Sequence, residues 1–311
     1  MMTITKERKS QIHEVLDNSY QLLQSGLVAK AMNLVVNQLN ETTKDLSQEV
    51  MSTEVREECL QHPISKLILQ EPMTKHSFQK PRGYSGDATL IDYMYKLKSC
   101  SLDDSYLGRE IYGCISSAGS VAAVRWRANH IAQSIEAFQQ KQGRKIDVIS
   151  VASGHLRELG YIKNADEKIS RFVCIDQDVQ SNQEVRSAYH KYSFLEIIDS
   201  SINYIIKNKL ADQKFDFIYS SGLFDYLNDK VASKMIERLY GNLREGGEMI
   251  IPNFLKGISE KAYMETFMKW NLIYRNEEDM RALISDLDIP NSKQEIYYDD
   301  MKKVVYLKIR K

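Results

Sequence analysis

Apolar residues recur every three or four positions through the first part of the chain. That spacing places them on one face of a helix, so it predicts mainly helical structure from about residue 5 to 70, interrupted at Pro63 and Pro72. The clearest positions are Ile12, Val15, Leu16, Leu22 and Leu23, and the pattern continues less regularly through Leu27, Met32, Leu34, Val35 and Leu39.

The periodicity stops at residues 73–87, MTKHSFQKPRGYSGD, where turn-forming residues predict an irregular segment. Helical spacing returns after Asp87, whose side chain is a good N-cap for a helix that begins at residue 88. A longer helix is expected over residues 121–140, and Gly143 is placed to end it.

After Gly143, short apolar runs alternate with helical stretches. Such alternation predicts parallel strands with helices on both faces of the sheet. Two final runs, separated by a tight turn at residues 299–301, predict an antiparallel hairpin. The expected strands are residues 145–151, 171–175, 194–198, 215–220, 248–254, 294–299 and 302–310.

The sequence thus predicts an α/β fold: a seven-stranded, mostly parallel, doubly wound sheet with a C-terminal antiparallel hairpin, plus an N-terminal helical cap. We place the cap or lid region at residues 1–142 and the sheet domain at residues 143–311. The N-terminal helices could form a cap, a dimer interface or both, so a homodimer stays open.

Composition narrows the function classes. Lys+Arg and Asp+Glu both number 42, so the formal net charge is zero and a long nucleic acid is not an expected partner. No apolar run reaches the length of a membrane span and the N-terminus lacks an apolar leader, which together predict a cytoplasmic protein. The 4 cysteines are scattered, so we expect reduced thiols, no disulfide framework and no metal site.

Small residues follow the first predicted strand. In such sheets ligands bind at the carboxyl ends of the strands, where small residues let a ligand approach the backbone. Ala152, Ser153 and Gly154 meet that need, although a tight turn without a ligand would use the same residues. Asp176 ends the second strand about twenty residues later, where a carboxylate can accept hydrogen bonds from a ribose diol. Asp178 is the alternative for that role, or else an N-cap.

The fourth strand also opens into small residues, from Ser220 to Gly222, and then into Phe224 and Tyr226. We expect this segment to face the ligand cleft from the far side of the point where the strand order reverses. The two aromatic residues could instead pack the start of a helix. Residues 243–247, LREGG, predict a helix end followed by a turn.

Together these features resemble the class I S-adenosylmethionine-dependent methyltransferases, although the first loop has one glycine where that family usually has GxGxG. A narrower resemblance rests on five stretches within residues 76–280. They are similar to a bacterial group implicated in making 3-hydroxy fatty acid methyl esters, which serve as extracellular signals. The stretches are KPRGYSGDATLIDYMY, VASGHLREL, CIDQD, YSSGLFDYL and WNLIYRNEEDM.

The resemblance implies S-adenosylmethionine as the cofactor and assigns its contacts. Ser200 and Ser201, just after the third strand, would lie at the adenine edge. The implied cofactor-binding residues are Tyr84, Ala152, Ser153, Gly154, Asp176, Gln177, Ser200, Ser201, Ser220, Ser221 and Gly222.

Ser150 stands where the family usually has an acid at the end of the first strand. The methionine end of the cofactor must therefore be held in another way. The candidates for that role are Arg82, Tyr84, His155, Arg157 and Glu158.

Residues 81–87, PRGYSGD, form the most unusual segment of the chain, because two glycines and a proline predict a fixed, non-repeating backbone. Arg82 offers a fork of donors for a carboxylate, and Tyr84 offers an aromatic face and a hydroxyl. We expect a lid or wall over the cofactor and substrate cleft. An Arg–Asp tether between the helical cap and the sheet is the alternative.

Methyl transfer from a sulfonium is an in-line displacement, so the enzyme has mainly to align the nucleophile and exclude water. A carboxylate is already ionised at neutral pH, whereas a hydroxyl or an amine needs a positioned base. Only His155 is placed to act as one. The lack of another base therefore favours methylation of a carboxylate, and the resemblance implies that of a small or fatty (hydroxy) acid. The candidate catalytic residues are Arg82, Tyr84, His155 and Tyr226.

Other interpretations stay open. The acceptor could be another metabolite or a protein side chain, or the chain could be a non-catalytic protein that binds S-adenosylmethionine. A nicotinamide-dependent oxidoreductase fits less well, because of the single early glycine and the terminal hairpin. Spacing alone does not decide which arginine would face an acid acceptor, with Arg125, Arg127 and Arg275 all next to aromatic residues.

Overall fold

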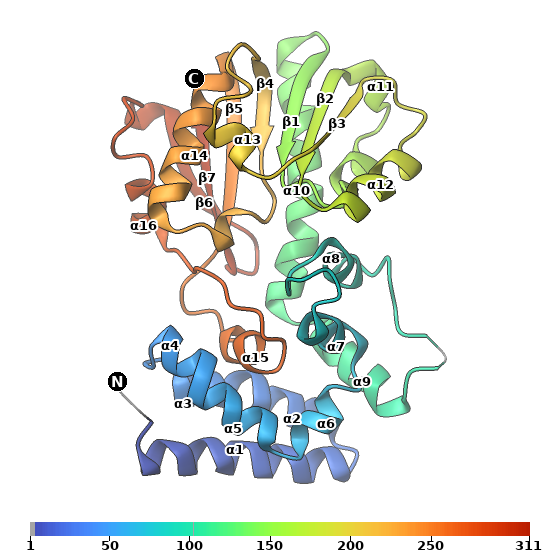
Figure 1. Ribbon diagram of the computed structural model, residues 1–311, viewed down its shortest axis with the longest axis vertical. Helices are drawn as coiled ribbons and strands as arrows, with labels where there is room; N and C mark the ends of the chain where they lie inside the picture. Colours follow the sequence, from blue (N-terminus) through green and yellow to red (C-terminus); the bar gives the residue numbers. More distant parts are fainter. Residues whose placement is uncertain (1–3, 102) are drawn as a thin grey trace. The chain divides into compact units, whose positions relative to one another are not determined.

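The computed structural model describes residues 4–101 and 103–311, which form two compact units (Figure 1). The helical unit comprises the chain up to Val124 together with Gly257–Leu272, and the sheet unit comprises Arg125–Lys256 and Ile273–Lys311. The division that we expected at residues 142 and 143 falls at the end of a long helix, whereas the units divide within that helix. A functional cap over residues 1–142 stays a prediction.

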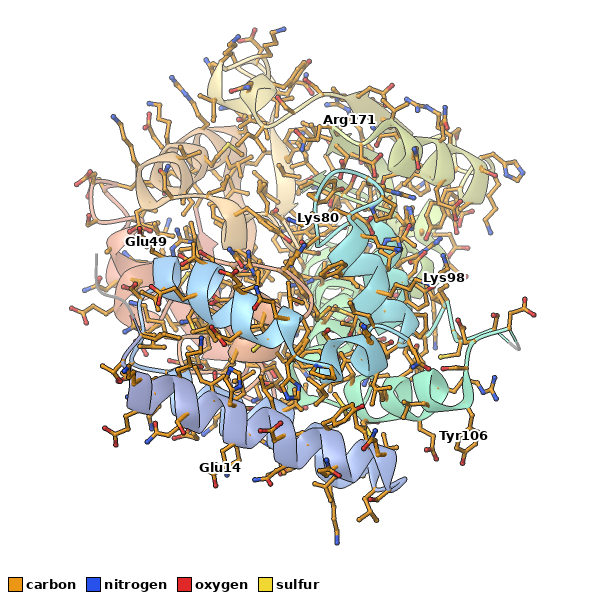
Figure 2. The ribbon with its side chains drawn as sticks, turned by 60° about the horizontal axis from the view of Figure 1, so that its bottom comes forward. Glu14, Glu49, Lys80, Lys98, Tyr106 and Arg171 are labelled. Atoms are coloured by element: carbon orange, nitrogen blue, oxygen red, sulfur yellow. The ribbon has the colours of Figure 1, made fainter. Side chains whose placement is uncertain are left out.

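The helical unit contains the N-terminal helices that the apolar spacing predicts. In α1 (Lys6–Gln24), Ile12 and Leu16 are fully buried, while Glu14 is exposed and its side chain points away from the other helices of the unit (Figure 2). One buried stripe per helix is the packing that such spacing allows. The other elements of this unit are α2 (Val28–Asn33), the π-helix η1 (Leu34–Gln38), α3 (Leu39–Thr43), α4 (Gln48–Val50), the π-helix η2 (Met51–Val55), α5 (Arg56–Gln61), α6 (Ile64–Ile68), α7 (Pro72–Gln79), α8 (Ala88–Met94), α9 (Tyr106–Ile115) and α15 (Lys261–Thr266).

The segment 73–87 is not irregular throughout, because α7 occupies its first half. The prediction was wrong there for a local reason. Pro72 suits the first turn of a helix, and the buried carboxylate of Glu71 accepts hydrogen bonds from the backbone N–H groups of Met73 and Thr74. These start signals specify a helix too short to show periodicity.

Asp87 begins α8 as predicted. Its Oδ1 accepts a hydrogen bond of 2.8 Å from the backbone N–H of Leu90. The same buried carboxylate lies 2.9 Å from His76 Nε2 on α7. The irregular segment is confined to residues 80–87, between α7 and α8. The contact between His76 and Asp87 holds the two flanking helices together at this segment.

Seven strands form the sheet of the other unit, in the order β3-β2-β1-β4-β5-β7-β6. The first five strands pair in parallel, and β7 runs antiparallel to both β5 and β6. The predicted fold class is therefore confirmed, including the C-terminal hairpin. The strands are β1 (Ile146–Val151), β2 (Ile169–Asp176), β3 (Leu195–Asp199), β4 (Phe215–Tyr219), β5 (Leu243–Phe254), β6 (Gln294–Tyr298) and β7 (Val304–Arg310).

Helices cover both faces of this sheet. On β4, Phe217 makes an edge contact with Phe138 of α10, whereas the next residue, Ile218, belongs to the core cluster that contains Met235 of α14. Successive side chains of a strand point to opposite faces, so α10 and α14 lie on different faces. The elements are α10 (Gly119–Gln142), η3 (Arg157–Tyr161), α11 (Ala165–Lys168), α12 (Val179–Ala188), α13 (Asn203–Ile206), η4 (Phe224–Tyr226), α14 (Asp229–Asn242), α16 (Glu277–Ala282) and η5 (Asn291–Lys293), the η elements being 3-10 helices.

The predicted helix end is correct, because the preceding helix ends at Asn242, but the LREGG segment itself belongs to β5 and is not a separate turn, so that part of the prediction was wrong. Leu243 pairs with Phe215 of β4, and the register then shifts before Glu248. Gly246 has a φ of +75° and donates a hydrogen bond to the carbonyl of Lys311, whose N–H donates to the carbonyl of Gly247. The glycines therefore permit a bulge inside the strand, which lengthens it toward its start.

A buried carboxylate fastens the start of β4 to its neighbours. Asp216 accepts hydrogen bonds from Arg144 at 2.6 and 3.0 Å, from Arg244 at 2.7 Å and from the backbone N–H of Asp147 at 2.8 Å. Burial by itself would raise the pKa of Asp216, but these donors outweigh it and hold the pKa below its usual value.

Asp216→Asn is expected to lower the free energy of unfolding at pH 7 by about 1–3 kcal/mol. Because the folded pKa of this carboxyl is depressed, its stabilisation is present above the unfolded pKa and is lost as pH falls through the folded one. The difference between wild type and variant should therefore shrink in acid, as measured by urea unfolding at pH 7 and near pH 3. A difference that stays constant with pH would contradict this, and Asp212→Asn at an exposed position is the control.

Within residues 4–101 and 103–311, no helix combines the length and apolar character needed to cross a membrane. The same residues contain no group of three or more His, Cys, Asp or Glu side chains arranged to hold a metal ion. All 4 cysteines carry free thiols, and those of Cys59 and Cys174 are buried. The cytoplasmic location stays a prediction.

Candidate cofactor site

The loop after β1 keeps the backbone of a glycine-rich loop without its glycines. The three glycine positions of a GxGxG pattern correspond to Ala152, Gly154 and Leu156, and their φ angles are +53°, +53° and +50°. A side chain in this left-handed region costs on the order of 1–3 kcal/mol, so the surrounding structure must impose the conformation. Part of that constraint is the carbonyl of Ile175 on β2, which accepts hydrogen bonds from the N–H groups of Ala152 and Ser153.

Asp176 joins the end of β2 to this loop. Its Oδ2 accepts a hydrogen bond of 2.7 Å from the N–H of Gly154, and its Oδ1 accepts one of 2.8 Å from the N–H of Asp178. Burial raises the pKa of Asp176, and the two N–H donors oppose that rise. Each oxygen keeps a second lone pair, so the carboxylate can still accept from the two hydroxyls of a ribose.

Asp178 acts as a helix N-cap, one of the two roles expected for it. Its carboxylate begins α12 by accepting from the N–H of Gln180 at 3.0 Å and from the hydroxyl of Ser181 at 2.7 Å. Gln177 is exposed between the two aspartates. The backbone N–H of Ser200 donates to the carbonyl of Asp176. The structure thus brings the end of β3 next to the end of β2, as the predicted adenine edge requires.

The residues after β4 have divided roles. The hydroxyl of Ser220 donates to the carbonyl of Val151 at 2.7 Å, which ties the ends of β4 and β1 together. Ser221 instead donates to Glu158 Oε1 at 2.7 Å. Phe224 is fully buried in the core, so packing explains it, whereas Tyr226 is 41% exposed. Assignment of Tyr226 to catalysis stays a prediction.

His155 follows Gly154 directly and is mostly buried. Its Nδ1 lies 3.4 Å from Nη2 of Arg157, a guanidinium that is also 3.1 Å from Glu184 Oε1. The neighbour of this ring nitrogen is thus a cation, whereas a general base is commonly oriented by a carboxylate at that position. This arrangement gives no support to His155 as a base, and its catalytic role stays a prediction.

Arg82 and Tyr84 belong to the helical unit. They lie in the irregular segment between α7 and α8, where Gly83 has a φ of +88°. The hydroxyl of Ser85 donates to the carbonyl of Lys269 at 2.8 Å, so the segment is anchored to the other stretch of chain in this unit. The roles of Arg82 and Tyr84 in cofactor binding and catalysis stay predictions.

One of the three arginines next to aromatic residues has a structural role. Arg275 is 1% exposed and gives its guanidinium to the carbonyls of Phe224 and Leu227, to Asn253 Oδ1 and to Asp229. These hydrogen bonds connect η4 to β5, so the guanidinium of Arg275 has a structural role.

The sequence did not assign Arg127 or Glu158 to the cofactor-binding or catalytic residues. Both are 4% exposed, and both lie at the carboxyl ends of β1 and β4. Arg127 is on α10, where nothing in its spacing indicates which strand end it faces. Glu158 was one of several candidates for holding the methionine end, and the signal that could have favoured it is its place one helical turn after the loop.

The central part of the sheet unit matches a known family. Residues 149–251 match the family model described as a methyltransferase domain. This stretch is similar to a methyltransferase domain. The predicted cofactor, S-adenosylmethionine, is confirmed with it. The left-handed loop backbone and the remaining lone pairs of Asp176 fit that cofactor, while the individual contacts stay predictions.

Solved structures share this fold at low sequence identity. A possible exported protein from Bordetella parapertussis is 15% identical, with a TM-score of 0.59 over 85% of this chain and 95% of that one. A methyltransferase candidate from Thermobifida fusca is 14% identical, with a TM-score of 0.55 over 80% of this chain and 98% of that one. No curated protein sequence matches the chain. At these identities the likeness concerns the fold alone.

Proposed function

We propose that the chain is an S-adenosylmethionine-dependent methyltransferase that transfers the methyl group directly to the carboxylate of a small or fatty (hydroxy) acid. The observation that carries the enzyme class is the hydrogen bond between Asp176 and the N–H of Gly154. It joins an acid after β2 to the turn after β1, at the place in a doubly wound sheet where a nucleoside is expected.

The preference for a carboxylate acceptor rests on the chemistry of the described residues. The cofactor supplies an electrophilic methyl group, so a nucleophile that is already ionised needs only to be aligned with it. A hydroxyl or amine acceptor would need a positioned base. His155 lies beside a guanidinium, and Asp176 and Asp178 accept from backbone N–H groups. No member of this set is an obvious base.

The five stretches similar to the fatty acid methyl ester group support a fatty hydroxy acid as the acceptor. The alternatives are another metabolite, a protein side chain, or binding of the cofactor without catalysis. Each alternative predicts a different fate for the methyl group, so one labelling experiment separates them.

The experiment incubates the full chain with S-adenosylmethionine labelled in its methyl group and with carboxylic acids, including 3-hydroxy fatty acids of increasing chain length. We expect label in an organic product that mild base releases as methanol, because an ester hydrolyses and an ether or amine does not. Base-stable label would identify a different acceptor. Cofactor binding without transfer to any acid would count against the proposed acceptor class.

A further inference from the structure

A buried arginine with an unused donor lies beside the end of β4. Arg127 on α10 is 4% exposed, and its Nε has no hydrogen-bond acceptor within reach among the described residues. Its Nη2 lies 3.7 Å from where a Cβ at Gly222 would stand. A guanidinium removed from water needs acceptors for its donors, so an incompletely bonded one indicates a missing anionic partner.

A buried carboxylate lies next to the same segment after β4. Glu158 on η3 is also 4% exposed and accepts a hydrogen bond from Ser221, the residue before Gly222. Burial raises the pKa of Glu158, and the charge of Arg127 partly offsets the rise. Arg127 acts in the same sense on the buried Asp225, whose pKa burial raises to about 6. The arginine is thus close enough to affect both carboxyls.

We propose that Arg127 and Glu158 form a site for a zwitterionic amino acid group, with Arg127 binding the carboxylate and Glu158 the ammonium. The inference rests on the proposed function, which supplies such a group as the methionine end of the cofactor. It also explains how the methionine end could be held although Ser150 stands where the family usually has an acid at the end of the first strand. A planar fork with an open Nε–H suits a carboxylate, which accepts two parallel hydrogen bonds.

A carboxylate could reach Arg127 from two sources, the cofactor or an acid acceptor. Glu158 favours the cofactor, because a simple acid has no ammonium to place beside a second buried carboxylate. A zwitterion carries both charges and leaves the net charge of the cluster unchanged. An acid alone would add a negative charge next to Glu158 and Asp225.

The test compares two ligands that differ in the amino acid group. S-adenosylhomocysteine carries it, and 5′-methylthioadenosine has the same nucleoside and a thioether without it. By calorimetry, Arg127→Gln should weaken S-adenosylhomocysteine binding about tenfold to a hundredfold, the range for a lost charge-assisted hydrogen bond. Its affinity for methylthioadenosine should match wild type. Glu158→Gln should show the same selectivity.

Arg157→Gln is the matched control, since Arg157 lies next to Glu158 but is paired with Glu184. It should bind both ligands like wild type. A selective loss in Arg157→Gln and none in Arg127→Gln would overturn the assignment. So would unchanged cofactor binding in Arg127→Gln with a raised KM for the acid, which would place the acceptor at this arginine.

Folding effects are separated by a second variant. Equal losses for the two ligands in Arg127→Gln and in the more conservative Arg127→Lys would assign Arg127 to the structure of the strand ends and overturn the proposal. If wild type bound neither ligand, the proposed function would fail. If it bound both but the variants did not discriminate them, the zwitterion site alone would fail.

Discussion

Asp176→Asn is expected to weaken S-adenosylmethionine binding about a hundredfold while the chain stays folded. The carboxylate now accepts from two backbone N–H groups, those of Gly154 and Asp178, and keeps one lone pair on each oxygen. An amide of the same shape would turn an NH2 group toward one of these donors. It would also lose the charge that strengthens bonds to a ribose diol.

Calorimetry with the wild type and the variant measures this effect, and the neighbouring aspartate provides the control. Asp178→Asn should bind the cofactor normally, because the carboxylate of Asp178 caps α12. Its change should appear in thermal unfolding at most, at the level of a helix cap of about 1 kcal/mol. Normal binding by Asp176→Asn, or a loss confined to Asp178→Asn, would show that the ribose site has been misassigned.

Arg275→Met is expected to lower the free energy of unfolding by about 3–5 kcal/mol, the cost of breaking a buried ionic network from one side. The guanidinium donates to two carbonyls of η4 and its flank and to Asn253 on β5. Methionine fills part of the volume but leaves those acceptors without donors in a site that water does not reach.

Denaturant unfolding measures this loss, and Asp229→Asn tests whether the ion pair or the buried bonds dominate. The side chain of Asp229 is 78% exposed, so losing its charge should cost less than about 1 kcal/mol. A small effect of Arg275→Met, or an equally large one of Asp229→Asn, would contradict the structural role of Arg275 described here.

Much of the sheet unit follows from local sequence. The buried, mostly apolar strands of five to eight residues, the N-cap at Asp87 and the helix end at Gly143 can each be predicted from a single segment. The position of Asp176 beside the loop after β1 could be predicted, because it depends on the end of one strand and on the distance from the previous loop. Its role in ribose binding stays a prediction. The short helix α7 was missed because its start depends on one proline and one buried cap.

The cofactor loop shows why a residue pattern and a backbone can disagree. A missing glycine suggests a lost conformation, yet Ala152 and Leu156 adopt the left-handed backbone that glycine would adopt freely. Part of the constraint comes from the hydrogen bonds that Ala152 and Ser153 donate to Ile175 on the neighbouring strand, a partner that no local pattern contains. Arg127 was hard to single out for a similar reason. Its buried Nε–H has no acceptor among the described residues, and only the folded structure shows this.

The measurement that tests the account most directly is calorimetric titration of the full wild-type chain with S-adenosylmethionine. We expect saturable binding at one site per chain, weakened about a hundredfold in Asp176→Asn and retained in Asp178→Asn. No detectable binding by the wild-type chain would contradict the cofactor, the proposed reaction and the amino acid site together.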